Sequence, residues 1–167
     1  DLQNPALYTN RELSWLLFNK RVLSEARDKQ LLLFERLKFL SITASNLDEF
    51  FMVRIGSLVD MIHAEYTKKD IAGMSAKEQL DALMEETHKF AALQYSTYNR
   101  MLLPQLRANG LNFVEHHEQL TERQAQDVDE YFEENVYPVL TPMAVDSSRP
   151  FPLIRNKTLN IGALVAK

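Results

Sequence analysis

The chain has 167 residues and a mass of 19.4 kDa, and its 19 Lys and Arg against 23 Asp and Glu give a net charge of −4. A general nucleic-acid-binding surface needs a basic excess, so no nucleic-acid partner is expected. The four glycines, six prolines and absence of cysteine favour a mostly helical globular chain and exclude disulfides, thiolate zinc sites and cysteine nucleophiles.

Helical spacing of apolar residues dominates the first hundred residues. A first helix is predicted over residues 14–27, starting near Asn10 or Ser14, and a second, shorter helix over residues 32–41. The apolar residues that share one face of the first helix, and that we expect to be buried, are Trp15, Phe18, Val22 and Ala26. Both segments therefore read as amphipathic helices.

Two capping patterns predict the next helix starts. Asn46 with Glu49 three positions later is typical of a helix N-terminus, and Ser75 with Glu78 repeats the pattern. The helix after Ser75 is predicted to run to about residue 102, where Pro104 kinks or ends it. Four helices with short connections indicate a small bundle.

The later part of the chain differs in composition. Asn109-Gly110 suits a left-handed helix C-cap and is taken as the domain boundary. Residues 111–114 are predicted as a strand, Thr121 opens a helix with Ala125, Val128 and Phe132 inward, and residues 137–144 and 154–166 are predicted as extended. The last segment has no partner strand, so we expect the chain to be a fragment of a larger protein.

The predicted fold class is mainly α, with an N-terminal helical bundle over residues 1–108 followed by a truncated α+β segment over residues 109–167. Each glycine stands alone, so the usual glycine-rich phosphate-binding loops are absent. Glu85-x-x-His88 is a single half of a di-iron pattern, and HExxH is missing. No apolar run approaches the roughly 18 residues of a membrane span. We expect neither a catalytic residue nor a metal site within the chain.

Three sequence blocks resemble type-1 polyphosphate kinases. They are Asn-Arg-Glu-Leu-Ser-Trp-Leu at 10–16, Ser-Asn-Leu-Asp-Glu-Phe-Phe at 45–51 and Tyr-Pro-Val-Leu-Thr-Pro at 137–142. The similarity extends in register from about residue 8 to residue 161, and residues 109–167 resemble the start of the family's head domain. One departure is Arg149, because the family pattern has a histidine before Pro150.

The resemblance implies an enzyme that reversibly transfers the terminal phosphate of ATP to polyphosphate, with Mg²⁺, through a phosphohistidine. The phosphohistidine and the metal ligands lie in the C-terminal half of the family, so this fragment alone is expected to be inactive. The partners implied are ATP, ADP and polyphosphate, with a homodimer or higher homo-oligomer in the cytoplasm. Membrane association, polymer length and the preferred direction of transfer are left open. The alternative is a non-catalytic α-helical protein-interaction module.

Asn46 is the one residue to which the resemblance assigns a binding role, a contact with the ATP base. From the residues alone, Asn46 is a helix cap, and the two roles are compatible. Phe39, Phe50 and Phe51 are candidates for apolar walls around adenine. The side chains that either line a polyanion path or are solvated helix charges are Arg36, Lys38 and Arg54. The stretch after Asp146 has no acidic residue, and its basic side chains could face polyphosphate or an acidic partner surface. They are Arg149, Arg155, Lys157 and Lys167.

Overall fold

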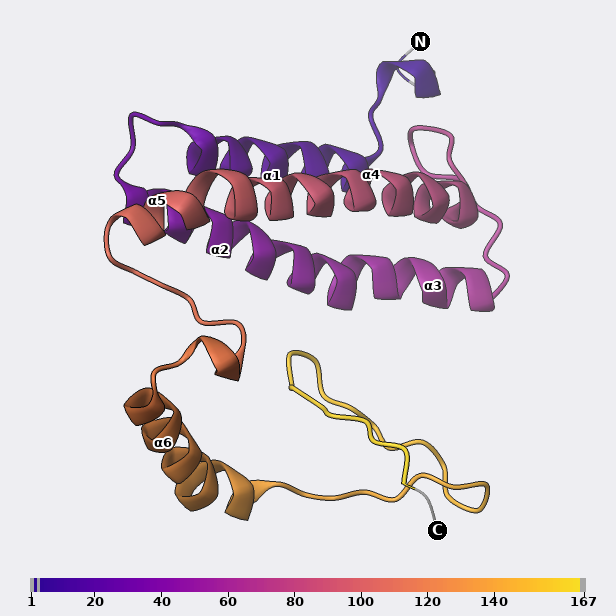
Figure 1. Cartoon of the computed structure of the whole chain (residues 1–167). Helices are drawn as coiled ribbons and strands as arrows, with labels where there is room; N and C mark the ends of the chain where they lie inside the picture. Colours follow the sequence, from indigo (N-terminus) through magenta and orange to yellow (C-terminus); the bar gives the residue numbers. More distant parts are fainter. Residues whose placement is uncertain (1, 3, 166–167) are drawn as a thin grey trace. The chain divides into compact units, whose positions relative to one another are not determined.

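The structure is a computed structural model that describes Leu2 and residues 4–165. It forms two compact units, Asp1–Phe113 and Val114–Lys167 (Figure 1). The first unit is a helical bundle with a buried core, and the second contains one α-helix and several short helical turns. The domain division between residues 108 and 109 stays a prediction.

Helix α1 (Arg11–Arg27) begins at the side chain of Asn10, one of the two caps considered for it. Asn10 Oδ1 accepts hydrogen bonds from the backbone N–H groups of Glu12 and Leu13, at 3.0 and 2.9 Å. Of the apolar stripe predicted for α1, Ala26 is buried and Trp15 and Val22 are half-buried, with Trp15 packed against buried residues of the core. The prediction is wrong for Phe18, which is 46% exposed. The buried residues on this face are Leu16, Asn19, Leu23 and Ala26. The spacing of apolar residues misplaced this face because one of its buried positions holds an amide, Asn19, that is satisfied by partners inside the bundle.

One continuous helical path replaces the predicted second and third helices. Helix α2 (Leu33–Phe50) passes into a π-helical turn (Phe51–Ile55), and α3 (Gly56–His63) follows directly. The predicted break after residue 41 and the predicted cap at Asn46 are therefore wrong. No glycine or proline interrupts residues 33–55, and Asn46 Nδ2 donates to Asn19 Oδ1 at 3.1 Å instead of starting a helix.

The second long path starts at α4 (Ala76–Thr97), where the predicted capping box is confirmed. Ser75 Oγ accepts from the Glu78 N–H, and Glu78 Oε2 accepts from the Ser75 N–H at 2.7 Å. The backbone hydrogen bond from Ser75 is also the main reason why the pKa of Glu78 lies below its ordinary value.

The path does not end at Pro104. A π-helical turn (Tyr98–Leu102) leads into α5 (Leu103–Ala108), in whose first turn Pro104 needs no N–H partner. The left-handed cap predicted at Gly110 is confirmed by its φ of +83° and by the bond from Leu111 N–H to the Leu106 carbonyl at 3.0 Å.

The core of the first unit lies between α1, α4 and the α2–α3 path, which run beside one another in Figure 1. One apolar cluster is centred on Leu16, Phe50, Ile55, Leu58, Ala76 and Leu83. A second is centred on Leu23, Ala26, Leu40, Phe90 and Leu102. Helices α1 and α4 contribute to both clusters, so burial of apolar surface holds the three paths together.

The second unit has a different character. Its α6 (Glu122–Tyr131) starts at the predicted Thr121 cap, where Thr121 Oγ1 accepts from the Gln124 N–H, and a π-helical turn (Phe132–Val136) follows. Short 3₁₀ turns cover His117–Gln119 and Tyr137–Val139, so the extended segment predicted from residue 137 begins only after Val139. Two side chains predicted to point inward from this helix are instead exposed. Val128 is 48% exposed and Phe132 is 44% exposed.

No strand is present in residues 4–165, so the strand predicted at residues 111–114 is wrong and the α+β character of the later segment is not seen. The final segment, predicted as extended over residues 154–166, forms no strand pairing up to residue 165. Its last residue, 166, lies outside the described residues. A strand forms only when a neighbouring segment accepts and donates its backbone hydrogen bonds, and alternating side chains alone do not provide one. Within the same described residues, no helix combines the length and the apolar character needed to cross a membrane.

Candidate functional site

A groove of about 710 Å³ opens on one side of the first unit. Its lining comes from the start of α1, from residues 46–61 of the α2–α3 path, from the loop at 66–71 and from the start of α4. Segments far apart in the sequence therefore form one concave surface, and this surface contains Asn46.

Asn46 is held by a chain of buried polar groups. It is half-buried, and its Nδ2 donates to Oδ1 of Asn19, which is fully buried in α1. Asn19 Nδ2 in turn donates to the Thr43 carbonyl at 3.1 Å, and Gln94 Nε2 donates to Thr43 Oγ1 at 3.0 Å. These bonds fix the amide plane of Asn46 and leave its Oδ1 and second N–H without a partner among the described residues.

An aromatic wall lies beside this amide. Trp15 and Phe50 stack with ring centroids 4.5 Å apart and planes inclined by 8°, and both line the groove together with Phe18. Of the walls predicted from the sequence, only Phe50 lies in the groove. Phe39 packs against the second apolar cluster, and Phe51 is not part of the lining.

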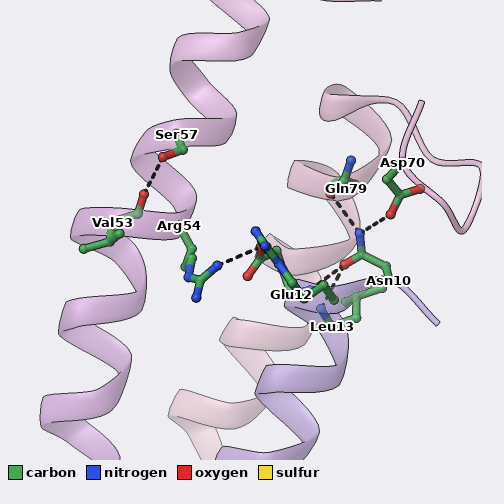
Figure 2. A network of polar contacts seen from close by, with 9 residues as sticks. Asn10, Glu12, Leu13, Val53, Arg54, Ser57, Asp70 and Gln79 are labelled. Atoms are coloured by element: carbon green, nitrogen blue, oxygen red, sulfur yellow. Dashed lines mark hydrogen bonds and ion pairs between the residues drawn. The ribbon is translucent and has the colours of Figure 1, made fainter. Parts of the chain in front are cut away.

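The other end of the groove is polar (Figure 2). Asn10 Nδ2 donates to Asp70 Oδ2 at 2.7 Å and to Gln79 Oε1 at 2.8 Å, which ties the start of α1 to the loop and to α4. Asp70 Oδ1 also accepts from the Met74 N–H at 2.7 Å. The loop that carries Lys68 and Lys69 is thereby anchored at the groove.

Glu12 collects two guanidinium groups at the same end. Its Oε1 accepts from Arg11 Nε and Nη2 at 2.9 and 2.6 Å, and Arg54 Nη1 lies 3.6 Å from the same oxygen. The Glu12 side chain is 7% exposed, whereas those of Arg11 and Arg54 are 78% and 42% exposed. A buried carboxylate thus orients two accessible cations.

The other predicted cations lie elsewhere. Arg36 is buried, where its Nε donates to the Ala26 carbonyl and its Nη1 to Gln105 Oε1, so it serves the bundle and not a polyanion path. Lys38 is exposed and its Nζ lies 4.0 Å from Glu35. Arg149 pairs with Asp146 in the second unit, and Lys167 lies outside the described residues.

The described residues do not fit Mg²⁺. No group of three or more His, Asp or Glu side chains among them could hold a metal ion. In the groove, Glu12 is occupied by two arginines, and both Asp70 oxygens already accept hydrogen bonds. A magnesium ion needs oxygen ligands in near-octahedral arrangement, which these carboxylates do not provide.

Sequence reasoning missed much of the groove. Trp15 and Phe18 were assigned to the core because their spacing is helical, and Arg11 and Glu12 were not singled out. Arg11, Glu12 and Trp15 belong to the block at 10–16 that opens the family resemblance, and Phe18 follows it by two residues, so the resemblance was the available signal. Nothing in the sequence around Tyr66, Lys68 and Lys69 indicated that this loop closes the groove.

The first unit is thus an all-helical domain with an open groove whose lining is partly polar and partly aromatic. Residues 8–114 match the family model of the polyphosphate kinase N-terminal domain, and residues 123–167 match that of the polyphosphate kinase middle domain. The chain belongs to the polyphosphate kinase family, which confirms the resemblance seen in the sequence.

Individual relatives agree with this assignment. The chain is 52% identical over 160 residues to a polyphosphate kinase of Lactiplantibacillus plantarum and 46% identical over 166 residues to one of Bacillus anthracis. These matches cover 96% and 99% of this chain but 22% and 24% of the relatives. The crystal structure of polyphosphate kinase from Porphyromonas gingivalis superposes with a TM-score of 0.69 at 31% identity, covering 88% of this chain and 20% of that one. The chain thus spans less than a quarter of the length of these relatives.

Proposed function

We propose that this chain is the N-terminal part of an enzyme that reversibly transfers the terminal phosphate of ATP to polyphosphate, and that its helical bundle binds the adenine of ATP. The phosphohistidine and the Mg²⁺ ligands of the reaction belong to parts of the enzyme outside these 167 residues, so the chain alone transfers no phosphate. Membership of the polyphosphate kinase family supports this proposal. The alternative, a non-catalytic interaction module, has no comparable observation in its favour.

The observation that supports the adenine role is the fixed amide of Asn46 in the groove. Adenine presents an amine donor next to a ring-nitrogen acceptor, and an asparagine side chain complements such a pair with one acceptor and one donor. Asn46 Oδ1 accepts from the amine, and the N–H not used by Asn19 donates to the ring nitrogen. Since Asn19 already fixes the amide orientation, little side-chain entropy is lost when the base binds.

The aromatic wall completes the base site. Phe18 is 46% exposed and Trp15 is half-buried, while Phe50, which stacks on Trp15, is buried at 2% exposure; all three line the same groove. A purine buries its flat apolar faces most favourably against aromatic side chains, while an amide at the edge sets its orientation. Amide and wall together favour a planar base over a bare phosphate at this end of the groove.

The test is the substitution Asn46→Ala in the full-length enzyme. Loss of two hydrogen bonds to the base is expected to raise KM for ATP about tenfold and to leave KM for polyphosphate in the reverse reaction unchanged. Ser45→Ala is the matched control, because Ser45 is an exposed neighbour on α2 that does not line the groove. An unchanged KM for ATP in a correctly folded Asn46→Ala enzyme would exclude the adenine contact.

The remaining family expectations belong to the same proposal. We infer a homodimer or higher homo-oligomer in the cytoplasm, with residues 109–167 as the beginning of the head domain. The size of the full-length enzyme in solution, measured by light scattering, tests the oligomeric state.

A further inference from the structure

The polar end of the groove holds more positive charge than its buried carboxylate neutralises. Arg11 and Arg54 both approach Oε1 of Glu12, and Figure 2 shows Arg54 reaching from the α2–α3 path toward Glu12 on α1. A guanidinium group has five N–H donors, of which Arg11 uses Nε and Nη2 in hydrogen bonds to Glu12. Arg54 Nη1 forms an ion pair with the same oxygen at 3.6 Å, too long for a hydrogen bond. The other donors have no partner among the described residues, and both side chains are accessible.

The surrounding charges favour an anion at this end. Lys68 and Lys69 line the groove from the anchored loop. Glu49 and Asp70 also line it, so with Glu12 the groove has three carboxylates against the four cations Arg11, Arg54, Lys68 and Lys69, an excess of one positive charge. Two accessible guanidinium groups held side by side by one buried carboxylate match the way phosphate oxygens accept paired N–H donors.

The spacing along the helical path places this charge away from the base site. Arg54 follows Asn46 by eight residues on the continuous α2–α3 path, which corresponds to a rise of about 12 Å. Both residues line the same groove, so it has an amide-and-aromatic end and a cationic end. A nucleotide carries its base and its phosphates at opposite ends, whereas inorganic polyphosphate offers only phosphates.

We propose that Arg11 and Arg54, held in place by Glu12, form a binding site for the oxygens of a phosphate anhydride. This site rests on the proposed function and extends it, because it gives the N-terminal bundle a phosphate contact in addition to the base contact. The ligand is either the phosphate tail of the nucleotide or a segment of inorganic polyphosphate, which have the same anhydride chemistry.

The test is isothermal titration calorimetry of the 167-residue chain with sodium tripolyphosphate and, separately, with ATP. Arg11→Gln and Arg54→Gln are each expected to weaken binding at least about tenfold, since each removes charge-assisted hydrogen bonds. Lys38→Gln is the matched control, because it makes the same charge change on α2 at an exposed side chain outside the groove, and it is expected to change affinity less than about twofold. Both arginines are accessible, and a circular dichroism spectrum identical to that of the wild type confirms that the variants fold.

Each arm of the titration has a distinct meaning. If Arg11→Gln and Arg54→Gln weaken the binding of ATP alone, the site holds the phosphate tail of the nucleotide. If they weaken the binding of tripolyphosphate, the site holds the inorganic chain. Affinities equal to the wild type for both ligands in both variants, or no binding of either ligand by the wild type, overturn the proposal. Asn46→Ala separates this result from the base site, because it is expected to weaken ATP and leave tripolyphosphate unaffected.

Discussion

The two units of the chain have similar local signals and different packing. Each has a helix that starts at a complete capping box, at Ser75 in the first unit and at Thr121 in the second. In the first unit the helix after the box carries Leu83 and Phe90, both fully buried, whereas no described residue of 114–165 is buried. A cap selects where a helix begins, but only neighbouring helices give it a core.

The sharpest test of this difference is a matched pair of phenylalanine substitutions. Phe90→Ala removes a side chain with 0% exposure and is expected to lower the free energy of unfolding by about 3–5 kcal/mol. Phe132→Ala removes the same atoms from a side chain that is 44% exposed and is expected to cost less than about 1 kcal/mol. Urea denaturation followed by circular dichroism measures both, and similar losses would mean that the second unit has a core of its own.

The two capping boxes provide a second, smaller comparison. Ser75→Ala and Thr121→Ala each remove one cap, at a cost of about 1 kcal/mol to the helix that follows. For α4 this cost is expected in the global unfolding of the bundle, because α4 packs on α1 and α3. For α6 we expect faster amide hydrogen exchange within Glu122–Tyr131 and no shift of the main urea transition. A shift of that transition by Thr121→Ala would contradict the comparison.

The smallest expected effect concerns pH. Hydrogen bonds from Lys20, the main cause, and Lys89 lower the pKa of Glu86 from 4.5 to about 2, and the Lys20 bond joins α1 to α4 at 2.7 Å. The stabilisation is fully present above pH 4.5 and is lost as the pH falls toward 2, because the carboxylate then becomes protonated in the folded state. Glu86→Gln should therefore flatten the dependence of the urea midpoint on pH in this range.

Asp146 is the matched control for that experiment. Its pKa is also lowered, mainly by the side chain of Ser148 two residues away, and the pair lies within one turn of the second unit. Asp146→Asn is expected to leave the urea midpoint unchanged at every pH. Equal effects of the two substitutions would show that the pairing across α1 and α4 contributes nothing beyond a local bond.

Local features of the fold were predictable because a few neighbouring residues determine them. The caps at Ser75 and Thr121 and the left-handed residue at Gly110 depend on hydrogen bonds within one turn. Asn46 has the same pattern and was mispredicted, because its partner, Asn19, is distant in sequence. The strand predicted at residues 111–114 failed for the same reason, since pairing depends on segments that the local pattern does not specify.

The candidate site was predictable only in part. Asn46 was singled out through the family resemblance, and Arg54 through its charge and its place near that motif, and both line the groove. Arg36 has the same charge as Arg54 but is buried. Its burial was not predictable, because the sequence does not show which side of a helix is covered by neighbouring helices. Phe18 was expected in the core because it is apolar and has helical spacing, yet the neighbouring helices leave it 46% exposed. Whether Asn46 binds adenine stays a prediction.

The π-helical turn at Phe51–Ile55 has a consequence for insertions and deletions. Such a turn holds about one residue more than an α-helical turn, so it rotates the following helix by roughly 100° relative to an unbroken α-helix. With this rotation Leu58 of α3 faces the core. Deleting one residue here would leave the composition almost unchanged but would rotate α3 about its axis, so that a different face of α3 would meet the core. Residue count, as well as side-chain identity, is therefore under constraint at this point of the chain.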